Sequence, residues 1–240
     1  AGAAGDAMVR RLADRLVAVD LLDQAAELLA HQVEFRLEGT EKADIGARLA
    51  MVQLLNRKPE LALKALADSA AKGLPLAVLK DRRIAESQAR TLMGDYASAI
   101  AVLDGLAGED VDLLRAGIYW RSRDWKKAAR VFARLAGPFP AVDETLDPKR
   151  SRHVMNWAVA LALSGESNRL AALGQTHGAA MVRTPLGEDF RVITAVESAP
   201  RDFAEVLKRA AMVDDFQTFM DNYRARLAGT PETSPASTGS

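Results

Sequence analysis

Cysteine is absent from this 240-residue chain, and aromatic residues make up only 5% of it. Without cysteine there is no disulfide, no thiolate metal ligand and no cysteine nucleophile. The longest apolar run, Trp157 to Leu163, is far shorter than the roughly 20 residues that cross a bilayer. Basic and acidic residues number 32 each, so no overall field attracts a polyanion. The sequence therefore indicates neither a membrane-spanning segment nor general affinity for nucleic acid.

The two ends of the chain differ in composition from the rest. The start, "AGAAGDAMVRR", has no methionine at its first position and no basic region leading into a hydrophobic one, as is typical of a processed end or an internal cut point. Residues 229–240 are small, polar and proline-containing, and they bury too little apolar area to offset their ordering entropy. We expect a disordered tail at 229–240, and a chain that is part of a longer protein or a larger complex.

Between these ends the sequence predicts helices. No stretch alternates apolar and polar residues with a period of two, and the long segments are rich in Ala, Leu, Arg, Glu and Lys at helical spacing. Five breaks are each expected to join two helices: Asp20, Arg57-Lys58-Pro59, Gly94-Asp95, Arg123-Asp124 and Gly165-Glu166. The sequence therefore predicts an all-α protein.

The five breaks share one frame of residue sizes. About five positions into the following helix lie Ala25, Ala62, Ala99, Ala128 and Leu170. Twelve positions earlier lie the small residues Ala13, Ala50, Ser87, Ala116 and Ala158. Four positions later come Leu29, Leu66, Leu103 and Phe132, and then Gly174, where the pattern fails. Small residues on facing helices permit close approach, and a large one fills the gap to the next pair. We therefore expect stacked helical hairpins.

Two of these units carry the clearest motif, with Gly94-Asp95-Tyr96 and Ala99 in one, and Ala116, Tyr119, Ala128, Phe132 and Pro140 in the next. They resemble the tetratricopeptide repeat, a helix-turn-helix unit of about 34 residues. The spacings here are 37, 37, 29 and 42 residues, and Gln53 and Arg90 stand where that repeat prefers a large apolar group. The resemblance covers about residues 7–175.

The resemblance implies a right-handed α-solenoid of stacked hairpins, with about five helix pairs in residues 7–175. Residues 176–228 would form a C-terminal helical cap, because a repeat array needs a terminal unit with a polar outer face. Two amphipathic segments, 188–199 and 215–228, fall in this cap. The alternative is that these residues form a small separate helical bundle.

No motif typical of catalysis or metal binding is present. His31, His153 and His177 are far apart in the sequence and form no cluster, so we interpret them as hydrogen-bonded or solvent-facing. There is no glycine-rich phosphate loop, and "SGES" at 164–167 is a hairpin turn in this frame rather than a nucleophile elbow. We expect no catalytic residue, no metal and no cofactor.

One cluster has a composition that also suits stacking on single-stranded nucleic acid. Its basic residues are Arg121, Arg123, Lys126, Lys127 and Arg130, interleaved with Tyr119, Trp120 and Trp125. Acidic residues flank the cluster and offset its field: Glu109, Asp110, Asp112 and Asp124. We therefore expect no nucleic-acid partner, and nucleic-acid binding through residues 119–130 stays an alternative.

In repeats of this kind the first helix of each pair lines a concave surface. Seven residues that the frame places there are expected to contact a partner, Arg10, Asp14, Met51, Ile84, Gln88, Trp120 and Met155, together with Arg121, the neighbour of Trp120. This mixture of apolar, amide and charged groups suits a peptide or a helix of a partner protein. Trp120, beside Gln88 and Arg121, has the composition of a binding hot spot; alternatively, its ring packs against Met155 in the core.

The predicted function is a non-catalytic scaffold that binds a protein or peptide through this concave face. The Ala- and Arg-rich composition resembles repeat proteins of Gram-negative bacteria, which implies an envelope, secretion or motility assembly. The absence of cysteine fits a cytoplasmic or a periplasmic location and does not decide between them. A different class stays open, a helical-repeat enzyme fragment similar to the superhelical transglycosylases. Nothing after Gly174 offers the glycine- and aromatic-rich lobe around a lone glutamate that such an enzyme needs.

Overall fold

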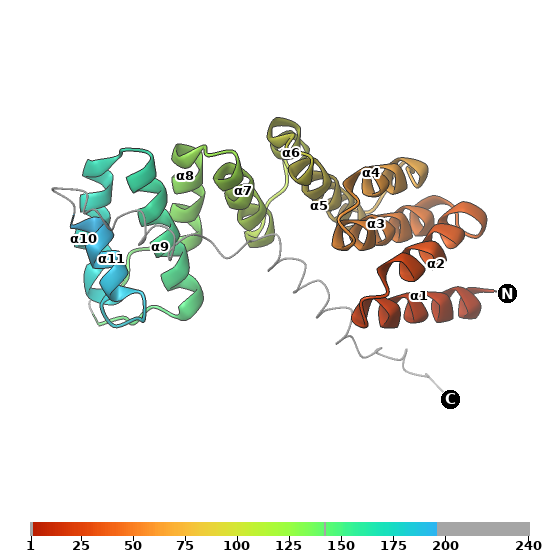
Figure 1. Cartoon of the computed structure of the whole chain (residues 1–240), viewed down its shortest axis with the longest axis horizontal. Helices are drawn as coiled ribbons and strands as arrows, with labels where there is room; N and C mark the ends of the chain where they lie inside the picture. The colour runs from red at the N-terminus through yellow and green to blue at the C-terminus, as the bar shows by residue number, and fades with distance from the viewer. Residues whose placement is uncertain (1, 142, 196–240) are drawn as a thin grey trace, which may run out of the picture. The chain divides into compact units, whose positions relative to one another are not determined.

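The computed structural model describes residues 2–141 and 143–195, and these ranges contain eleven α-helices and no strand (Figure 1). The first six helices are α1 (Ala3–Ala18), α2 (Leu22–Phe35), α3 (Gly39–Leu55), α4 (Pro59–Asp68), α5 (Leu76–Leu92) and α6 (Tyr96–Val102). The other five are α7 (Glu109–Arg121), α8 (Trp125–Ala136), α9 (Pro148–Leu163), α10 (Ser167–Met181) and α11 (Gly187–Thr194). The prediction of an all-α protein is confirmed for the described residues.

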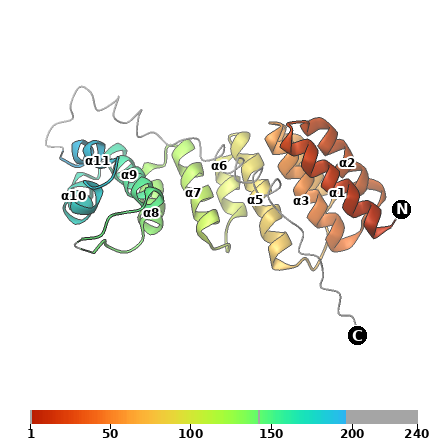
Figure 2. The same cartoon turned by 90° about the horizontal axis from the view of Figure 1, so that it is seen from below.

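The helices fall into two compact units that divide between Val102 and Leu103. In the first unit, α1 to α6, each helix packs against the next, and α3 also packs against α5. In the second unit, α7 to α11, each helix again packs against the next, and α11 also reaches α9. Figure 2 shows helices of the first unit, α1 to α3, α5 and α6, from a second direction.

Five tight turns join the helices of successive pairs with one backbone geometry. In each turn one residue is left-handed, with φ of 63° at Asp20, 56° at Arg57, 79° at Gly94, 59° at Arg123 and 73° at Gly165. The N–H of the following residue donates to the carbonyl five positions back, as from Asp95 to Arg90 at 2.9 Å. This is the Schellman ending of a helix. The five predicted breaks are confirmed as turns between helices.

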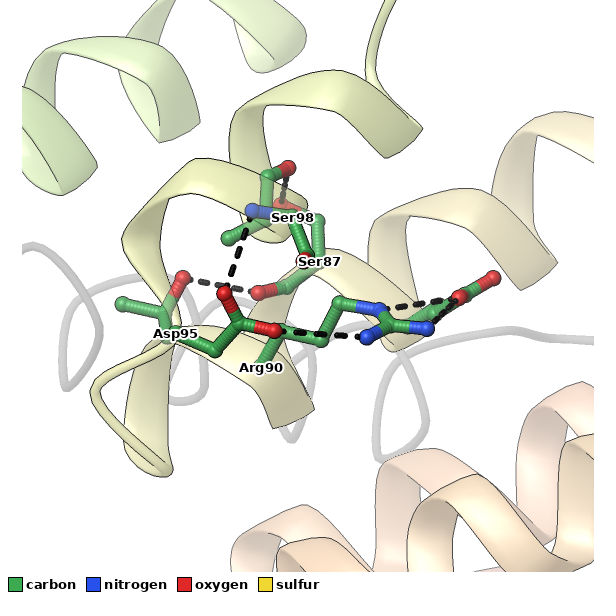
Figure 3. A network of polar contacts seen from close by, with 7 residues as sticks. Ser87, Arg90, Asp95 and Ser98 are labelled. Carbon is green, nitrogen blue, oxygen red and sulfur yellow. Dashed lines mark hydrogen bonds and ion pairs between the residues drawn. The ribbon is translucent and has the colours of Figure 1, made fainter.

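Side chains reinforce the turn between α5 and α6 (Figure 3). The carboxylate of Asp95 accepts a hydrogen bond from the backbone N–H of Ser98 at 3.2 Å, which caps α6, and another from Arg90 at 3.4 Å. On the buried side the hydroxyl of Ser87 donates to the carbonyl of Ala99 at 2.8 Å. This bond directly joins two residues that the sequence frame predicts to face each other.

The frame of residue sizes marks buried positions throughout. The residues five positions after each left-handed residue are at most 5% exposed: Ala25, Ala62, Ala99, Ala128 and Leu170. Those twelve positions earlier are at most 1% exposed: Ala13, Ala50, Ser87, Ala116 and Ala158. The large residues are buried as well: Leu29, Leu66, Leu103 and Phe132. The periodic small and large residues therefore form the helix-to-helix core.

Gly174 interrupts the pattern because a third helix occupies the space of the missing side chain. A Cβ on Gly174 would lie 2.9 Å from the Cβ of Thr194, in the last turn of α11. Real Cβ atoms do not approach so closely, since protein interiors have little free space. Glycine at this position therefore lets α11 pack against α10.

Arginines on first helices donate to carbonyl groups near the end of the element before them. Arg82 of α5 donates to Leu66 of α4, and Arg150 of α9 donates to Ala136 of α8 at 2.7 Å. In the loop ahead of α7, the carbonyl of Leu103 accepts from Arg115 at 2.8 Å. The last carbonyls of a helix have no partner within it, and a guanidinium supplies several donors. The arginines thus hold successive helices together, a role that the sequence analysis did not assign.

Most of the predicted C-terminal cap and the whole predicted tail lie outside the described residues. α11 covers the first amphipathic segment as far as Thr194, whereas segment 215–228 and residues 229–240 are not described. The boundaries at 7–175 and 176–228 therefore stay predictions.

Candidate binding site

Five of the eight residues expected to contact a partner lie on first helices of the first unit. Arg10 and Asp14 lie on α1, Met51 on α3, and Ile84 and Gln88 on α5. Arg10 and Asp14 are half-buried, but Met51, Ile84 and Gln88 are only 5%, 7% and 1% exposed. A partner can reach Arg10 and Asp14 directly. Contact with the other three would require the groups that cover them to move.

Ion pairs connect α1 to later helices. Asp14 pairs with Arg48 on α3, and both side chains are about a quarter exposed. The carboxylate of Asp6 accepts a hydrogen bond from Arg36 at 3.1 Å. That bond lowers the pKa of Asp6, and the positive charge of Arg10 lowers it further. Both carboxylates of α1 are therefore paired with arginines from elsewhere in the first unit.

The other three predicted residues belong to the second unit. Trp120 is half-buried, and its ring meets Trp125 edge-on at 5.2 Å and Phe132 at 6.0 Å between centroids. Met155 is 2% exposed and lies in the same hydrophobic core as Phe132, against which Trp120 packs. Arg121 is exposed. Trp120 thus contributes part of its ring to the core and leaves part exposed, and its predicted proximity to Gln88 of the first unit stays a prediction.

The basic and aromatic cluster at residues 119–130 is partly neutralised by its own carboxylate. Asp124 pairs with the ammonium of Lys127 at 2.8 Å, and that ammonium lies 5.5 Å from the ring centroid of Tyr119. Burial acts to raise the pKa of Asp124, but hydrogen bonds from Lys127 outweigh it and lower the pKa. Tyr119 and Trp125 are half-buried. The cluster therefore holds at least one cation in place against a carboxylate and an aromatic ring.

The expectation that the histidines are hydrogen-bonded or solvent-facing is confirmed for His31, which is exposed, and for His177, whose Nδ1 lies 2.9 Å from the hydroxyl of Thr176. It is wrong for His153, which is buried and whose Nε2 has no hydrogen bond within the described ranges; the carboxylate of Glu109 lies 4.0 Å from that atom.

The Nε2 atom of His177 is also buried without a hydrogen-bond partner among the described residues. The rings of Trp157 and Phe139 lie 5.7 and 5.9 Å from that of His177, so the imidazole packs between aromatic neighbours. Desolvation lowers the pKa of His153 and of His177.

Neither a metal site nor a membrane span is evident in residues 2–141 and 143–195. No three acidic or histidine side chains there are grouped to hold a metal ion, and none of the helices in these ranges is both long and apolar enough to cross a bilayer. No family model matches the chain, and no match is found among curated proteins or solved structures. In the described residues the structure is all-helical, and within each unit consecutive helices pack together.

Proposed function

We propose that this chain is a tetratricopeptide-like α-solenoid and a non-catalytic scaffold, which binds a partner protein or peptide through a concave face formed by its first helices. The observation that carries the proposal is the repetition of one hairpin geometry. Each of five turns has one residue in the left-handed conformation, followed five positions later by a buried residue of the frame. Stacked repeats of one hairpin form an extended binding surface without any reactive group.

Trp120 is the strongest candidate for a binding hot spot. Its ring is held edge-on by Trp125 and Phe132, so it loses little rotational freedom when a partner covers its exposed part. Rigid aromatic rings beside an arginine are typical of residues that dominate binding energy. Arg121, next to it and exposed, could then bind a backbone carbonyl or a carboxylate of the partner.

α11 supports the proposal of a C-terminal cap. Its inner side chains, Phe190 and Ile193, are at most 1% exposed. On its outer side Glu188 and Arg191 pair at 2.7 Å and are both exposed. A helix with one apolar and one charged face is what the terminal unit of a repeat array requires. The proposed place of this array is a larger bacterial envelope, secretion or motility assembly.

The experiment that tests the proposal compares Trp120→Ala with Phe139→Ala, a substitution of an aromatic residue that is 74% exposed in the same unit. Each variant and the unchanged chain would serve as bait for affinity capture from the source cell, with proteins quantified by mass spectrometry. We expect one or a few proteins to be enriched by the unchanged chain and by Phe139→Ala, but not by Trp120→Ala.

Thermal melting separates binding from folding in the same set of variants. If Trp120 is a hot spot, Trp120→Ala loses the partner while its melting changes little. A loss of roughly 3–5 kcal/mol of stability, typical of deleting a buried tryptophan, would instead assign the ring to the core. Turnover of peptidoglycan by the purified chain would favour the transglycosylase-like alternative. Tight binding of a single-stranded oligonucleotide that Lys126→Glu abolishes would favour nucleic-acid binding through residues 119–130.

A further inference from the structure

One face of α1, continued by the C-cap residue Val19, is apolar and exposed to solvent. Met8, Leu12 and Val19 are 70%, 47% and 65% exposed, and together with the exposed Arg15 they recur at intervals of four, three and four residues. This spacing places all four on one side of a helix. These four residues, the α1 stripe, include a positive charge and no carboxylate.

The repeat frame identifies the residues that correspond to this stripe in the next helix pair. Met8 and Leu12 lie five positions and one position before Ala13, the small residue of the frame in α1. Ile45 and Leu49 lie at the same distances before Ala50 in α3. The side chains of Ile45 and Leu49 are only 3% and 5% exposed. The same positions of the repeat are thus buried in α3 and open in α1.

Hydrogen bonds at both ends of the corresponding stripes show what these positions face. In α5 the first position of the stripe is Arg82, which donates to Leu66 of α4. In the α3 pair the last position is Asn56, which donates to Asp23 of α2 at 2.6 Å. Both acceptors belong to the second helix of the preceding pair. The α1 stripe therefore occupies the positions that, in the next two helix pairs, face the second helix of the pair before.

We infer that the α1 stripe docks an amphipathic helix of a partner protein, whose apolar residues are flanked by carboxylates, in the way that α3 packs against α2. The negative charge expected of the partner helix follows from one difference between α1 and α3. Arg15 stands where α3 has the fully buried Val52, so the occupant of the α1 stripe must place a carboxylate near a guanidinium. The helix α2 already has this character, with Asp23, Glu27 and Glu34 and no lysine or arginine.

A second copy of this chain fits the stripe less well. Two α1 stripes facing each other would bring together surfaces that carry arginine and no acidic residue. Like charges at the centre of an interface oppose association. An acidic helix instead complements both the apolar side chains and Arg15.

The probe for this inference is a fluorescent, side-chain-stapled peptide with the sequence of residues 22–35, titrated with the full chain and followed by anisotropy. Stapling is needed because an isolated helix of this length is marginal in water. We expect saturable binding, with a dissociation constant below about 1 mM. Leu12→Asp should weaken it at least about tenfold, because a carboxylate then replaces an apolar contact. Leu61→Asp, at an equally exposed leucine of α4 (44%), should leave it unchanged.

A charge swap tests the acidic character of the occupant. Arg15→Glu should weaken binding of the acidic peptide several-fold at low salt. A second peptide, in which the three carboxylates are replaced by lysine, should bind Arg15→Glu more tightly than it binds the unchanged chain. The side chains of Leu12 and Arg15 are both exposed in the fold. Circular dichroism should therefore show unchanged helix content and melting for Leu12→Asp and for Arg15→Glu.

Three results would overturn the inference. The first is no saturable binding up to about 1 mM, and the second is equal affinity for the unchanged chain and Leu12→Asp. The third is a dimer, detected by light scattering, that Leu12→Asp dissociates, because a second copy would then cover the stripe. Trp120→Ala should bind the peptide like the unchanged chain, so this test succeeds or fails independently of the proposed concave site.

Discussion

Replacing Ala99 by leucine tests whether the frame of small residues marks the contact between paired helices. Ala99 has no exposed surface, and its carbonyl accepts the hydroxyl of Ser87 from the facing helix at 2.8 Å. That bond places α5 and α6 in direct contact, so a larger side chain has no room unless α6 moves. Overpacking of this kind destabilises by about 1–3 kcal/mol, and loss of the Ser87 bond would add about 1 kcal/mol.

Ala97→Leu is the matched control, because Ala97 lies on the same helix and is exposed. Alanine and leucine have similar helix propensities, so this substitution should change stability by less than about 0.5 kcal/mol. Ala128→Leu, at the same position of the frame in the second unit, should behave like Ala99→Leu. Urea unfolding followed by circular dichroism measures all three. Equal shifts for Ala97→Leu and Ala99→Leu, or no shift for Ala99→Leu, would refute the frame.

Three further predictions concern the turns, the contact between α10 and α11, and pH. Gly94→Ala should destabilise by about 1 kcal/mol through backbone strain alone, since nothing lies within 4 Å of the added Cβ, whereas Arg57→Gly should be neutral or stabilising by urea unfolding. Gly174→Ala should lower the free energy of unfolding less, by at least about 1 kcal/mol, in a Thr194→Gly background than in the unchanged chain, because Thr194→Gly removes the clash. Additive effects of the two substitutions would contradict this. Burial depresses the pKa of His153 and His177 in the fold, so the unfolded chain binds protons first as pH falls below about 6.5. Stability is then lost at up to about 1.4 kcal/mol per pH unit for each. Replacing both by phenylalanine should flatten the melting temperature between about pH 6.5 and 5.5, and an unchanged slope would show that carboxylates dominate.

The hairpins could be predicted from the sequence because their determinants are local. Gly94 and Gly165 adopt the left-handed conformation without steric cost. Proline is tolerated in the first turn of a helix but not in its interior, so Pro59 marks the start of the helix that follows the turn at Arg57. The buried alanines could then be located by their distance from each turn, without knowing which residues surround them. The exception at Gly174 is visible in the sequence, but its cause is not, because that cause is Thr194 on α11, twenty residues further along the chain.

The candidate site was less predictable because exposure depends on tertiary contacts. Periodicity assigned Met51 and Arg10 to the same lining row, yet one is buried and the other half-buried. The ring of His177 lies 5.9 Å from that of Phe139, which comes from the irregular loop between α8 and α9. The pairing of Arg82 with Leu66 likewise joins two helices that no local pattern connects. A weak signal existed, since Arg82, Arg115 and Arg150 each lie on the first helix of a pair.

Small-angle X-ray scattering tests most directly whether the hairpins stack into one continuous solenoid, the claim on which the proposed concave site depends. A compact chain of this length would have a radius of gyration of about 18 Å. We expect a clearly larger radius and an asymmetric distance distribution with a long tail, both of which should persist when residues 229–240 are deleted. A radius near 18 Å with a symmetric distribution would contradict it.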